Sequence, residues 1–423
     1  MKRIINIQLL LWLIVASFFF SSCCKQESID KKEPINQIKL SQKITASDGK
    51  AGDKFGNSVS ISGDYAIVGT GEDLDEWRDQ GSAYIFYHSG GSWVQQAKLT
   101  VNDEEYGDEF GNSVSISGDY AIVANYLDDI GENEDQGSAY IFHRVGNTWV
   151  QQAKLTANDG NLLDHFGSSV SISGNYAIVG ADKKLMENDN QGAAYVFHRS
   201  GSTWTQQAKL LADNGATGGF FGNSVSISGD FAIVGAYLDD AGGNYNQGSA
   251  YIFHRSENSW TQQAKLTAFD GDDSDFFGSS VSISRDYAIV GAYLDRVGIN
   301  GNQGSAYIFH FTGSSWIQET KITAGDGKGH DNFGNSVSIS GDYAIVGAFL
   351  SDNEENFHQG SAYVFHRSGS LWTEHLKLIG EDGASQDRFG KSVSISGDHA
   401  IIGAFFDRVE GNTNQGSAYI YDK

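Results

Sequence analysis

The chain has 423 residues, a length that suits two or three ordinary domains, although propellers and barrels of this size also occur as single domains. Its 52 glycines, 52 aromatic residues and single proline argue against a disordered chain and favour a β-rich globular protein. The formal net charge of −24 repels phosphate backbones, so we expect no nucleic-acid binding.

The N-terminus has the organisation of an export signal. Lys2 and Arg3 precede an apolar run over residues 9–20, which is shorter than the ~20 residues that a membrane span requires. Small residues then stand directly before Cys23. This pattern resembles a bacterial lipoprotein signal and implies that Cys23 is lipidated after cleavage. We therefore predict a signal peptide over residues 1–22, with an ordinary secretory signal as the alternative.

The residues after the signal indicate a tether. Apart from Cys23 the chain has one cysteine, Cys24, so the remainder offers neither a disulfide framework nor a Cys-based metal site. Residues 23–37 are polar, include the only proline and are expected to form the lipid attachment and a flexible linker. These features predict a lipid-anchored protein of the bacterial cell envelope, facing either the periplasm or the cell exterior.

One unit recurs seven times after the tether. The dipeptide Phe-Gly opens a nearly identical phrase in each copy, at intervals of 55 or 56 residues. The phrases begin at Phe55, Phe110, Phe166, Phe221, Phe277, Phe333 and Phe389. Such regularity is the signature of a repeat architecture, and it covers the chain from about Ile38 to the C-terminus.

Each unit predicts four short strands. In the first unit they are SVSIS at 58–62, YAIVG at 65–69, SAYIF at 82–86 and WVQQAKLT at 93–100. The second and third are apolar on both faces, so protein must cover both sides of the sheet. Four-stranded sheets that pack face to face at this period are typical of a β-propeller.

The strand count predicts how the ring closes. The chain ends at Lys423, just after the third strand of the seventh unit, whereas residues 38–45 supply a spare fourth strand ahead of the first unit. Pairing the N-terminal strand with the last blade removes two exposed sheet edges. We therefore expect an all-β fold over residues 38–423, a seven-bladed β-propeller with four antiparallel strands per blade.

The repeated phrase resembles the FG-GAP repeat of the integrin α-subunit propeller, in the shorter variant of bacterial surface proteins. The resemblance rests on Phe-Gly followed by Ser-Val at residues 55–59, on Val-Gly-Ala at 234–236 and on Gly-Ser-Ala-Tyr at 248–251. It implies the propeller fold. The calcium loop of some integrin blades is replaced here by a tight turn at residues 62–64, so the resemblance implies no calcium at that position.

The acidic residues are expected to gather on one face of the propeller. Because propeller strands alternate in direction, the segments before Phe-Gly and those after the second strand emerge on the same side. These segments, which we call the acidic loop face, hold 40 of the 53 acidic residues and nine basic ones. Such crowding favours cations.

A pair of aspartates recurs in the segments before Phe-Gly, seven and two residues ahead of the Phe. Carboxylates in a short glycine-containing loop can bind a hard cation, so calcium is one interpretation, and a purely structural role in the turn is the other. No cofactor is certain. The pairs are Asp48 with Asp53, Asp103 with Asp108, Asp159 with Asp164, Asp270 with Asp275, Asp326 with Asp331, and Asp382 with Asp387.

The sequence favours binding over catalysis. It lacks the short motifs of nucleophilic hydrolases, zinc proteases and phosphate loops, and we expect no enzyme. The irregular polar residues on the acidic loop face show no spacing of a nucleophile and its base. They are Trp77, His165, Lys183, Lys184, His330 and His358.

Variable loops on a uniform scaffold are typical of recognition surfaces. We therefore expect a monomeric, non-catalytic binding or adhesion scaffold, attached to the membrane through its lipid anchor only. Its acidic loop face would bind a protein, a glycan or a cation-bridged ligand. An enzyme acting on envelope polymers and a cation-stabilised structural surface module are the alternatives.

Overall fold

The structure is a computed structural model that describes residues 38–71, 80–101, 108–184, 191–213, 215 and 218–423. Residues Lys39–Asp422 form one compact unit. Within these ranges all regular elements are β-strands, and none is a helix with the length and apolar character of a membrane span. The predicted signal peptide and tether, with Cys23, lie outside the described residues.

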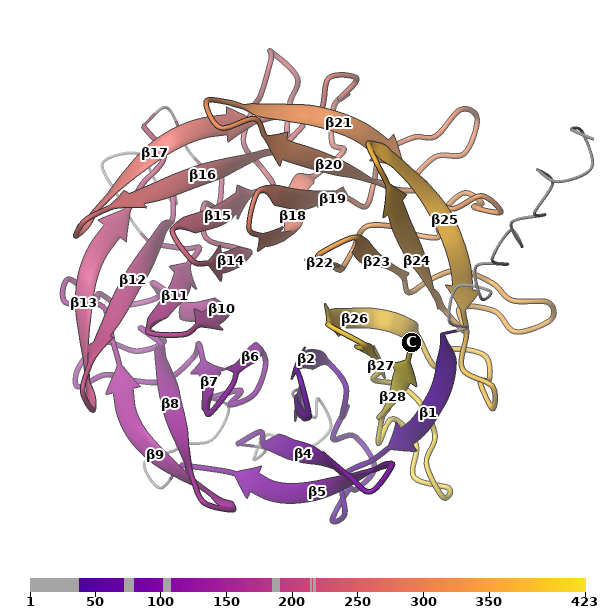
Figure 1. Ribbon diagram of the computed structural model, residues 1–423, viewed down its shortest axis with the longest axis horizontal. Helices are drawn as coiled ribbons and strands as arrows, with labels where there is room; N and C mark the ends of the chain where they lie inside the picture. Colours follow the sequence, from indigo (N-terminus) through magenta and orange to yellow (C-terminus); the bar gives the residue numbers. More distant parts are fainter. Residues whose placement is uncertain (1–37, 72–79, 102–107, 185–190, 214, 216–217) are drawn as a thin grey trace, which may run out of the picture. The chain divides into compact units, whose positions relative to one another are not determined.

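The strands form seven separate four-stranded antiparallel sheets. Figure 1 shows them arranged as blades in a ring, with the first strand of each unit innermost. Residues of the innermost strands line a central channel. Blade 1 comprises β2 to β5, and the blades follow in chain order to blade 7, which comprises β26, β27, β28 and β1. The prediction of an all-β, seven-bladed propeller is confirmed.

The strands occupy equivalent positions in every blade. The innermost strands are β2 (Ser58–Ser62), β6 (Val114–Ser117), β10 (Phe166–Ser173), β14 (Val225–Ser228), β18 (Phe277–Ser284), β22 (Val337–Ser340) and β26 (Phe389–Ser396). The second strands are β3 (Tyr65–Gly69), β7 (Tyr120–Asn125), β11 (Tyr176–Ala181), β15 (Phe231–Ala236), β19 (Tyr287–Ala292), β23 (Tyr343–Ala348) and β27 (His399–Ala404). The third strands are β4 (Ala83–Ser89), β8 (Ser138–Val145), β12 (Ala193–Ser200), β16 (Ser249–Ser256), β20 (Ser305–Phe311), β24 (Ser361–Ser368) and β28 (Ser417–Asp422). The outer strands are β5 (Ser92–Leu99), β9 (Thr148–Leu155), β13 (Thr203–Leu210), β17 (Ser259–Leu266), β21 (Trp316–Ile322), β25 (Leu371–Leu378) and β1 (Lys39–Ile44).

The ring closes through the N-terminal strand, as the strand count predicts. β1 pairs antiparallel with β28 and becomes the outer strand of blade 7. The register sets Lys39 opposite Asp422 and Ile44 opposite Ala418. The first and last parts of the repeat array are thereby joined by a sheet, which leaves no blade with an unpaired third strand.

The apolar core lies between neighbouring blades. The Phe of each Phe-Gly phrase is at most 1% exposed and packs against aromatic residues of the third strand. In blade 5, for example, Phe277 meets Tyr307 edge to face at 5.4 Å. The same cluster includes Ile233 and Ile252 from blade 4. The Phe-Gly phrase recurs because each blade needs one large apolar group to fill the space beside its neighbour.

Serines of the innermost strands connect each blade to the next. The free edge of an innermost strand faces the channel, and its backbone N–H groups need acceptors. In blade 2 the Ile116 N–H donates to the Ser60 hydroxyl of blade 1 at 3.2 Å, and at the closure the Ile61 N–H donates to Ser394 of blade 7 at 3.2 Å. The phrase Val-Ser-Ile-Ser therefore places valine and isoleucine in the core and serine at the seam.

Candidate functional site

The two sets of acidic loops meet at one end of the blades. Parallel bridges join the glycine before a third strand to the Phe of the next blade, as between Gly248 and Phe277 and, across the closure, between Gly416 and Phe55. Backbone hydrogen bonds reinforce this contact, for example from the Phe277 N–H to the Gln247 carbonyl at 2.8 Å. The loops before Phe-Gly and those after the second strand therefore form one continuous surface.

The first aspartate of each pair is bonded to the outer and third strands of its own blade. Asp48 accepts hydrogen bonds from the Tyr84 hydroxyl at 3.0 Å and from the Lys98 ammonium at 2.7 Å. The same two bonds recur at Asp159, Asp270, Asp326 and Asp382. Asp103 lies outside the described residues.

The second aspartate of each pair closes the turn that lies between the two aspartates. Its carboxylate accepts the backbone N–H of the residue three positions earlier, as Asp275 does from Asp272 at 2.6 Å. The same bond forms at Asp53, Asp164, Asp331 and Asp387. Both members of each described pair thus already have protein partners in a turn, which supports the structural interpretation. Calcium binding at these residues stays a prediction.

A further aspartate that the sequence analysis missed joins the pairs from the loop after the second strand. In blade 5, Asp295 is 3% exposed and shares the Lys321 ammonium with Asp270, each at 2.7 Å. Equivalent aspartates are Asp128, Asp239 and Asp407. Their recurrence four residues after Val-Gly or Val-Ala, or after the Ile-Gly of the last unit, could have identified them.

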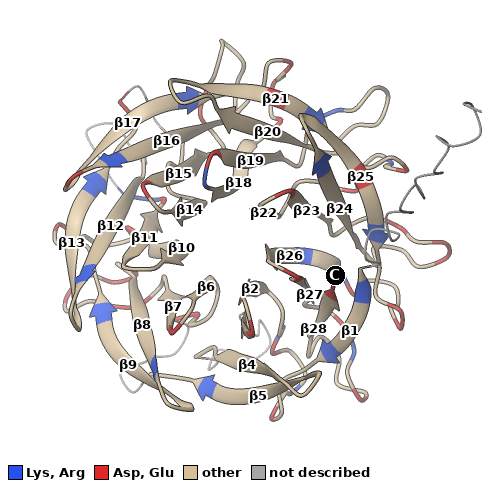
Figure 2. Ribbon diagram, in the orientation of Figure 1, with Lys and Arg blue, Asp and Glu red and all other residues tan. Residues whose placement is uncertain are grey.

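The lysines of the outer strands reduce the charge of the acidic loop face. Lys43, Lys98, Lys154, Lys209, Lys265, Lys321 and Lys377 each form an ion pair with a loop aspartate. Figure 2 shows basic residues at recurring positions on the outer strands and acidic residues mainly in the loops. A count of charges within the loops omits these seven lysines and so overstates the negative charge of this face.

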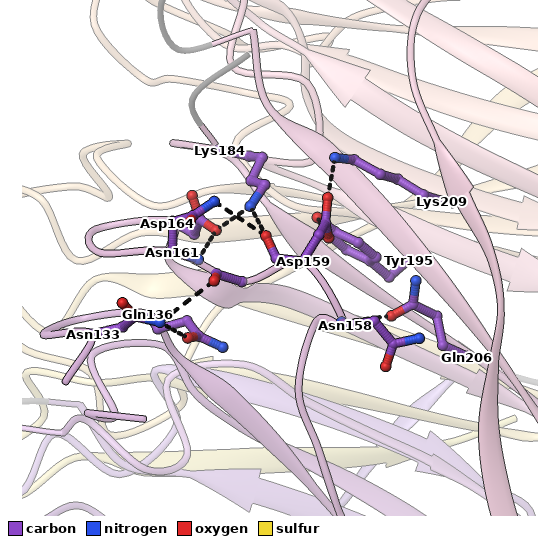
Figure 3. A network of polar contacts seen from close by, with 11 residues as sticks. Asn133, Gln136, Asn158, Asp159, Asn161, Asp164, Lys184, Tyr195, Gln206 and Lys209 are labelled. Carbon is purple, nitrogen blue, oxygen red and sulfur yellow. Dashed lines mark hydrogen bonds and ion pairs between the residues drawn. The ribbon is translucent and has the colours of Figure 1, made fainter. Parts of the chain in front are cut away.

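Blade 3 departs from this arrangement. Lys184 occupies the position of the additional aspartate, and its ammonium lies 2.5 Å from the Asp164 carboxylate (Figure 3). It also donates to the Asp159 backbone carbonyl. Lys184 and Asp164 are both almost fully buried, with side chains 2% and 1% exposed. A cation from the chain itself therefore balances the paired aspartates in this blade.

Burial separates the pKa values of the two aspartates in a pair. Burial acts to raise the pKa of Asp382, but hydrogen bonds from Lys43 and Tyr419 hold this pKa below its ordinary value. Burial, with the neighbouring Asp295 and Asp272, raises the pKa of Asp275 to about 6. Asp387 behaves alike, because burial and the nearby Asp407 raise its pKa to about 6.

We expect Asp275→Asn to stabilise the protein at neutral pH. In the native state Asp275 keeps its proton up to about pH 6, whereas in the unfolded chain the same carboxyl group loses it near pH 3.8. Because the native state binds the extra proton, the free energy of unfolding falls as the pH rises from about 4 to about 6. The variant lacks this loss and should exceed the wild type by on the order of 2 kcal/mol at pH 7.5, with the difference vanishing near pH 4. Thermal unfolding across this range measures it. Asp273→Asn, at the exposed neighbour, is the control, and an advantage independent of pH would contradict the expectation.

The central channel is lined by small polar residues of the innermost strands. A cavity of about 390 Å³ is bounded by the Asn-Ser-Val or Ser-Ser-Val triplets of the blades. Blade 7 contributes Lys391, and burial lowers the pKa of this lysine. Its ammonium lies 5.4 Å from the centre of the Phe349 ring and 5.7 Å from that of Phe405.

Aromatic side chains recur at the blade ends that carry the acidic loops, and the rings of Phe349 and Phe405 lie near Lys391 of the channel. The recurring side chains come from the residue before Phe-Gly and from the residue after the second strand, and we call them the aromatic collar. The collar consists of Tyr126, His165, Phe220, Tyr237, Phe276, Tyr293, Phe349 and Phe405. Some members touch: Tyr237 of blade 4 contacts Phe276 of blade 5 at 5.5 Å, and Phe276 contacts Tyr293 of its own blade at 5.8 Å.

The collar also binds a guanidinium group of the chain itself. Arg388 lies 4.7 Å from the ring of Phe406, 5.8 Å from Phe405 and 5.9 Å from Phe349. Several collar residues adopt left-handed backbone conformations although they are not glycine, with φ of 56° at His165, 55° at Phe220 and 59° at Phe276. This conformation is unusual for such residues.

The structure brings Lys183 near His165 but does not assemble the described irregular polar residues of the acidic loop face into one group. His165 is 8% exposed and packs on Tyr126, and burial lowers its pKa to about 4. Lys184 is held by Asp164, whereas His358 stacks on Phe357 and His330 lies beside Asn302. Trp77 lies outside the described residues. The collar and its strained backbone were not visible in the sequence, because its members come from six separate units.

Comparison with known proteins identifies the repeated unit. A family model described as the FG-GAP repeat matches residues 39–86, 93–142, 149–197, 204–253, 260–309, 316–365 and 372–421. Each match begins with the outer strand of one blade and continues through the first three strands of the next, which is the same offset that closes the ring. No functionally curated protein matches the chain. The matches cover most of the sequence, and the protein therefore belongs to the FG-GAP repeat family.

Proposed function

We propose that this propeller is a non-catalytic binding scaffold whose acidic loop face and aromatic collar hold a basic segment of a partner protein. The observation that carries the proposal is the contact of Arg388 with Phe349, Phe405 and Phe406. It supports the proposal because the same collar presents further partly exposed rings, Phe276 and Tyr293 among them, in the sector of blades 4 and 5. Aromatic rings attract arginine and lysine through their faces.

Carboxylates elsewhere on the acidic loop face favour the same partner. A hollow of about 520 Å³ lies between the loops of blades 6 and 7. Asp326, Asp352, Glu354 and Glu381 line it together with Lys328 and Lys377. Glu354 and Glu381 are exposed, whereas Asp326 is bonded to Lys377. Exposed acidic groups attract a cationic segment at a distance, and the aromatic rings of the collar offer a contact for the desolvated cation.

We expect a fluorescein-labelled octa-arginine peptide to bind the purified chain, with an affinity that falls as salt is added. Glu354→Gln with Glu381→Gln should weaken binding about tenfold at low ionic strength, because two exposed charges of the face are lost. Phe276→Ala with Tyr293→Ala should weaken it through loss of ring contacts, with less dependence on salt. Fluorescence anisotropy measures both effects.

The matched control removes two carboxylates from the opposite end of the blades. Asp230→Asn with Asp398→Asn changes the net charge equally, and the chain itself carries asparagine at the equivalent Asn175. We expect this control to leave peptide binding nearly unchanged. If the control weakens binding as much as the loop variant, net charge alone attracts the peptide and the proposed face is wrong.

We further propose that the scaffold is held at the bacterial envelope by a lipid on Cys23. The support is the N-terminal pattern of a basic start, a short apolar run and small residues before the cysteine. Protease treatment of intact cells tests the exposed side: cleavage of the propeller indicates a partner outside the cell, and protection indicates a periplasmic partner. Release of a Cys23→Ala variant from the membrane fraction would support the anchor, and its retention would contradict it.

A further inference from the structure

The blades contact one another through a recurring polar pair at the end opposite the acidic loops. An arginine of the third strand bonds to the aspartate or asparagine in the turn between the first and second strands of its own blade. The arginine also stacks on the aromatic residue that begins the second strand of the preceding blade. The stacked pairs are Arg144 on Tyr65 at 4.8 Å, Arg199 on Tyr120 at 4.4 Å, Arg255 on Tyr176 at 4.6 Å and Arg367 on Tyr287 at 4.3 Å.

The seam that closes the ring replaces both members of this pair with histidine. His88 of blade 1 takes the place of the arginine, and His399 of blade 7 takes the place of the tyrosine. The turn aspartate, Asp64, is retained, with its carboxylate 3.8 Å from His88 Nδ1. The two imidazole rings meet at 5.4 Å.

The three side chains converge on one point. Each offers one ligand atom, and these atoms all lie within 4.8 Å of one another. Among the described residues this is the one group of three or more His, Cys, Asp or Glu side chains with that geometry, whereas the aspartate pairs of the acidic loops do not form one. Asp64 is exposed and both histidines are partly exposed, so a solute ion can reach them.

The surroundings orient both histidines. His399 Nδ1 lies 2.7 Å from a carboxylate oxygen of Asp422, its register partner on β28, which leaves Nε2 as the free nitrogen. A carboxylate behind an imidazole is the usual outer support of a metal-binding histidine. The ring of His88 stacks on the buried Trp93 at 5.1 Å, and the backbone N–H of His88 donates to the backbone carbonyl of Asp64 at 2.8 Å. Four of these five residues lie on strands, so the group is held by rigid backbone.

We propose that Asp64, His88 and His399 form a binding site for a divalent transition-metal ion of the zinc class at the closing seam. Two imidazoles and one carboxylate are a ligand set that zinc uses, with a fourth position left for water. Metal–ligand bonds of about 2.1 Å in a tetrahedron place ligand atoms about 3.4 Å apart. His88 and Asp64 are 3.8 Å apart and the three ligand atoms lie within 4.8 Å of one another, so binding requires the side chains to move closer by about 1 Å.

The seam between blades 4 and 5 provides a comparison, because there the pair is replaced by apolar residues. Between blades 4 and 5 both members of the pair are also replaced, and there Phe231 and Phe311 meet edge to face at 5.3 Å. The closing seam instead brings together two nitrogen ligands and a carboxylate. A bound ion would connect the first and last blades, where β1 already completes the sheet of blade 7. The site is at the opposite end from the acidic loop face and does not depend on the proposed ligand.

Isothermal titration of the purified, EDTA-treated full chain with zinc chloride tests the site. We expect one zinc ion per chain and a rise in melting temperature with zinc concentration, because the ion binds the closed ring and not the unfolded chain. His88→Arg with His399→Tyr restores the pair used at four other seams, so it should fold, and it should lose at least about 100-fold in zinc affinity. Asp64→Asn, which copies Asn175, should weaken binding at least about tenfold without changing the seam's shape.

A gain of binding provides the complementary test. Tyr65→His with Arg144→His, beside Asp119, transfers the three ligands to the seam between blades 1 and 2, and the stoichiometry should rise from one zinc ion to two. No zinc binding by the wild type would overturn the proposal. Unchanged affinity and stoichiometry in both the Asp64→Asn variant and the double histidine variant would also overturn it, because the ion would then bind elsewhere.

Discussion

Gly278→Ala is expected to destabilise the propeller by at least about 3 kcal/mol, seen as a large drop in melting temperature. Gly278 is the glycine of the fifth Phe-Gly phrase and has φ of +91°, a conformation that alanine rarely adopts. A Cβ added there would also lie 2.2 Å from the Ser249 carbonyl oxygen, which is backbone and cannot move aside easily. Strain and collision act together, so blades 4 and 5 would have to separate.

Gly229→Ala separates these two causes. Gly229 also has a positive φ, of 60°, but a Cβ added there meets no atom within 4 Å. The equivalent position of blade 5 is Arg285, with φ of 57°, so a side chain is tolerated in this turn. We expect a cost of about 1 kcal/mol for the control. Equal losses in the two variants would mean that backbone strain alone explains the glycine of Phe-Gly.

Lys184→Met is expected to cost about 3 to 5 kcal/mol, because it leaves the buried Asp164 carboxylate without its cation. The ammonium of Lys184 lies 2.5 Å from Asp164, and both side chains are at most 2% exposed. Methionine keeps most of the volume, so the loss would come from charge rather than from a cavity. Thermal or urea unfolding of the variant and the wild type measures the difference.

Two further variants test whether the loss of stability comes from the unpaired charge of Asp164. Lys183→Met changes the neighbouring exposed lysine and should be nearly neutral. Asp164→Asn combined with Lys184→Met removes both charges and should recover more than half of the loss, because no buried charge remains unpaired. A double variant as unstable as Lys184→Met would show that the lysine acts through packing instead.

The repeat itself made the fold accessible to sequence analysis. The period of 55 or 56 residues, with four short strands in each unit, predicts both the blade and the number of blades. The predicted first and second strands of the first unit, at 58–62 and 65–69, coincide with β2 and β3. The spare strand ahead of the first unit predicted the pairing of β1 with β28. These inferences succeed because each depends on residues within one unit or on a count of units.

The candidate sites were less accessible. The spacing of Asp48 and Asp53 was visible, but the partners of Asp48 are Tyr84 and Lys98, which lie on other strands of the blade. Without them the carboxylates looked available for calcium and the face looked more acidic than it is. His88 and His399 stand in units at opposite ends of the array, and only ring closure brings them together.

The sequence by itself determined the secondary structure, the blade number and the closing strand, because alternation and repetition are local properties of the chain. Tertiary structure alone decided which charges are balanced and which side chains meet across a seam. The physical reason is that ion pairing and coordination act over a few ångströms, between groups that the chain separates by tens to hundreds of residues and that only the closed ring brings within reach.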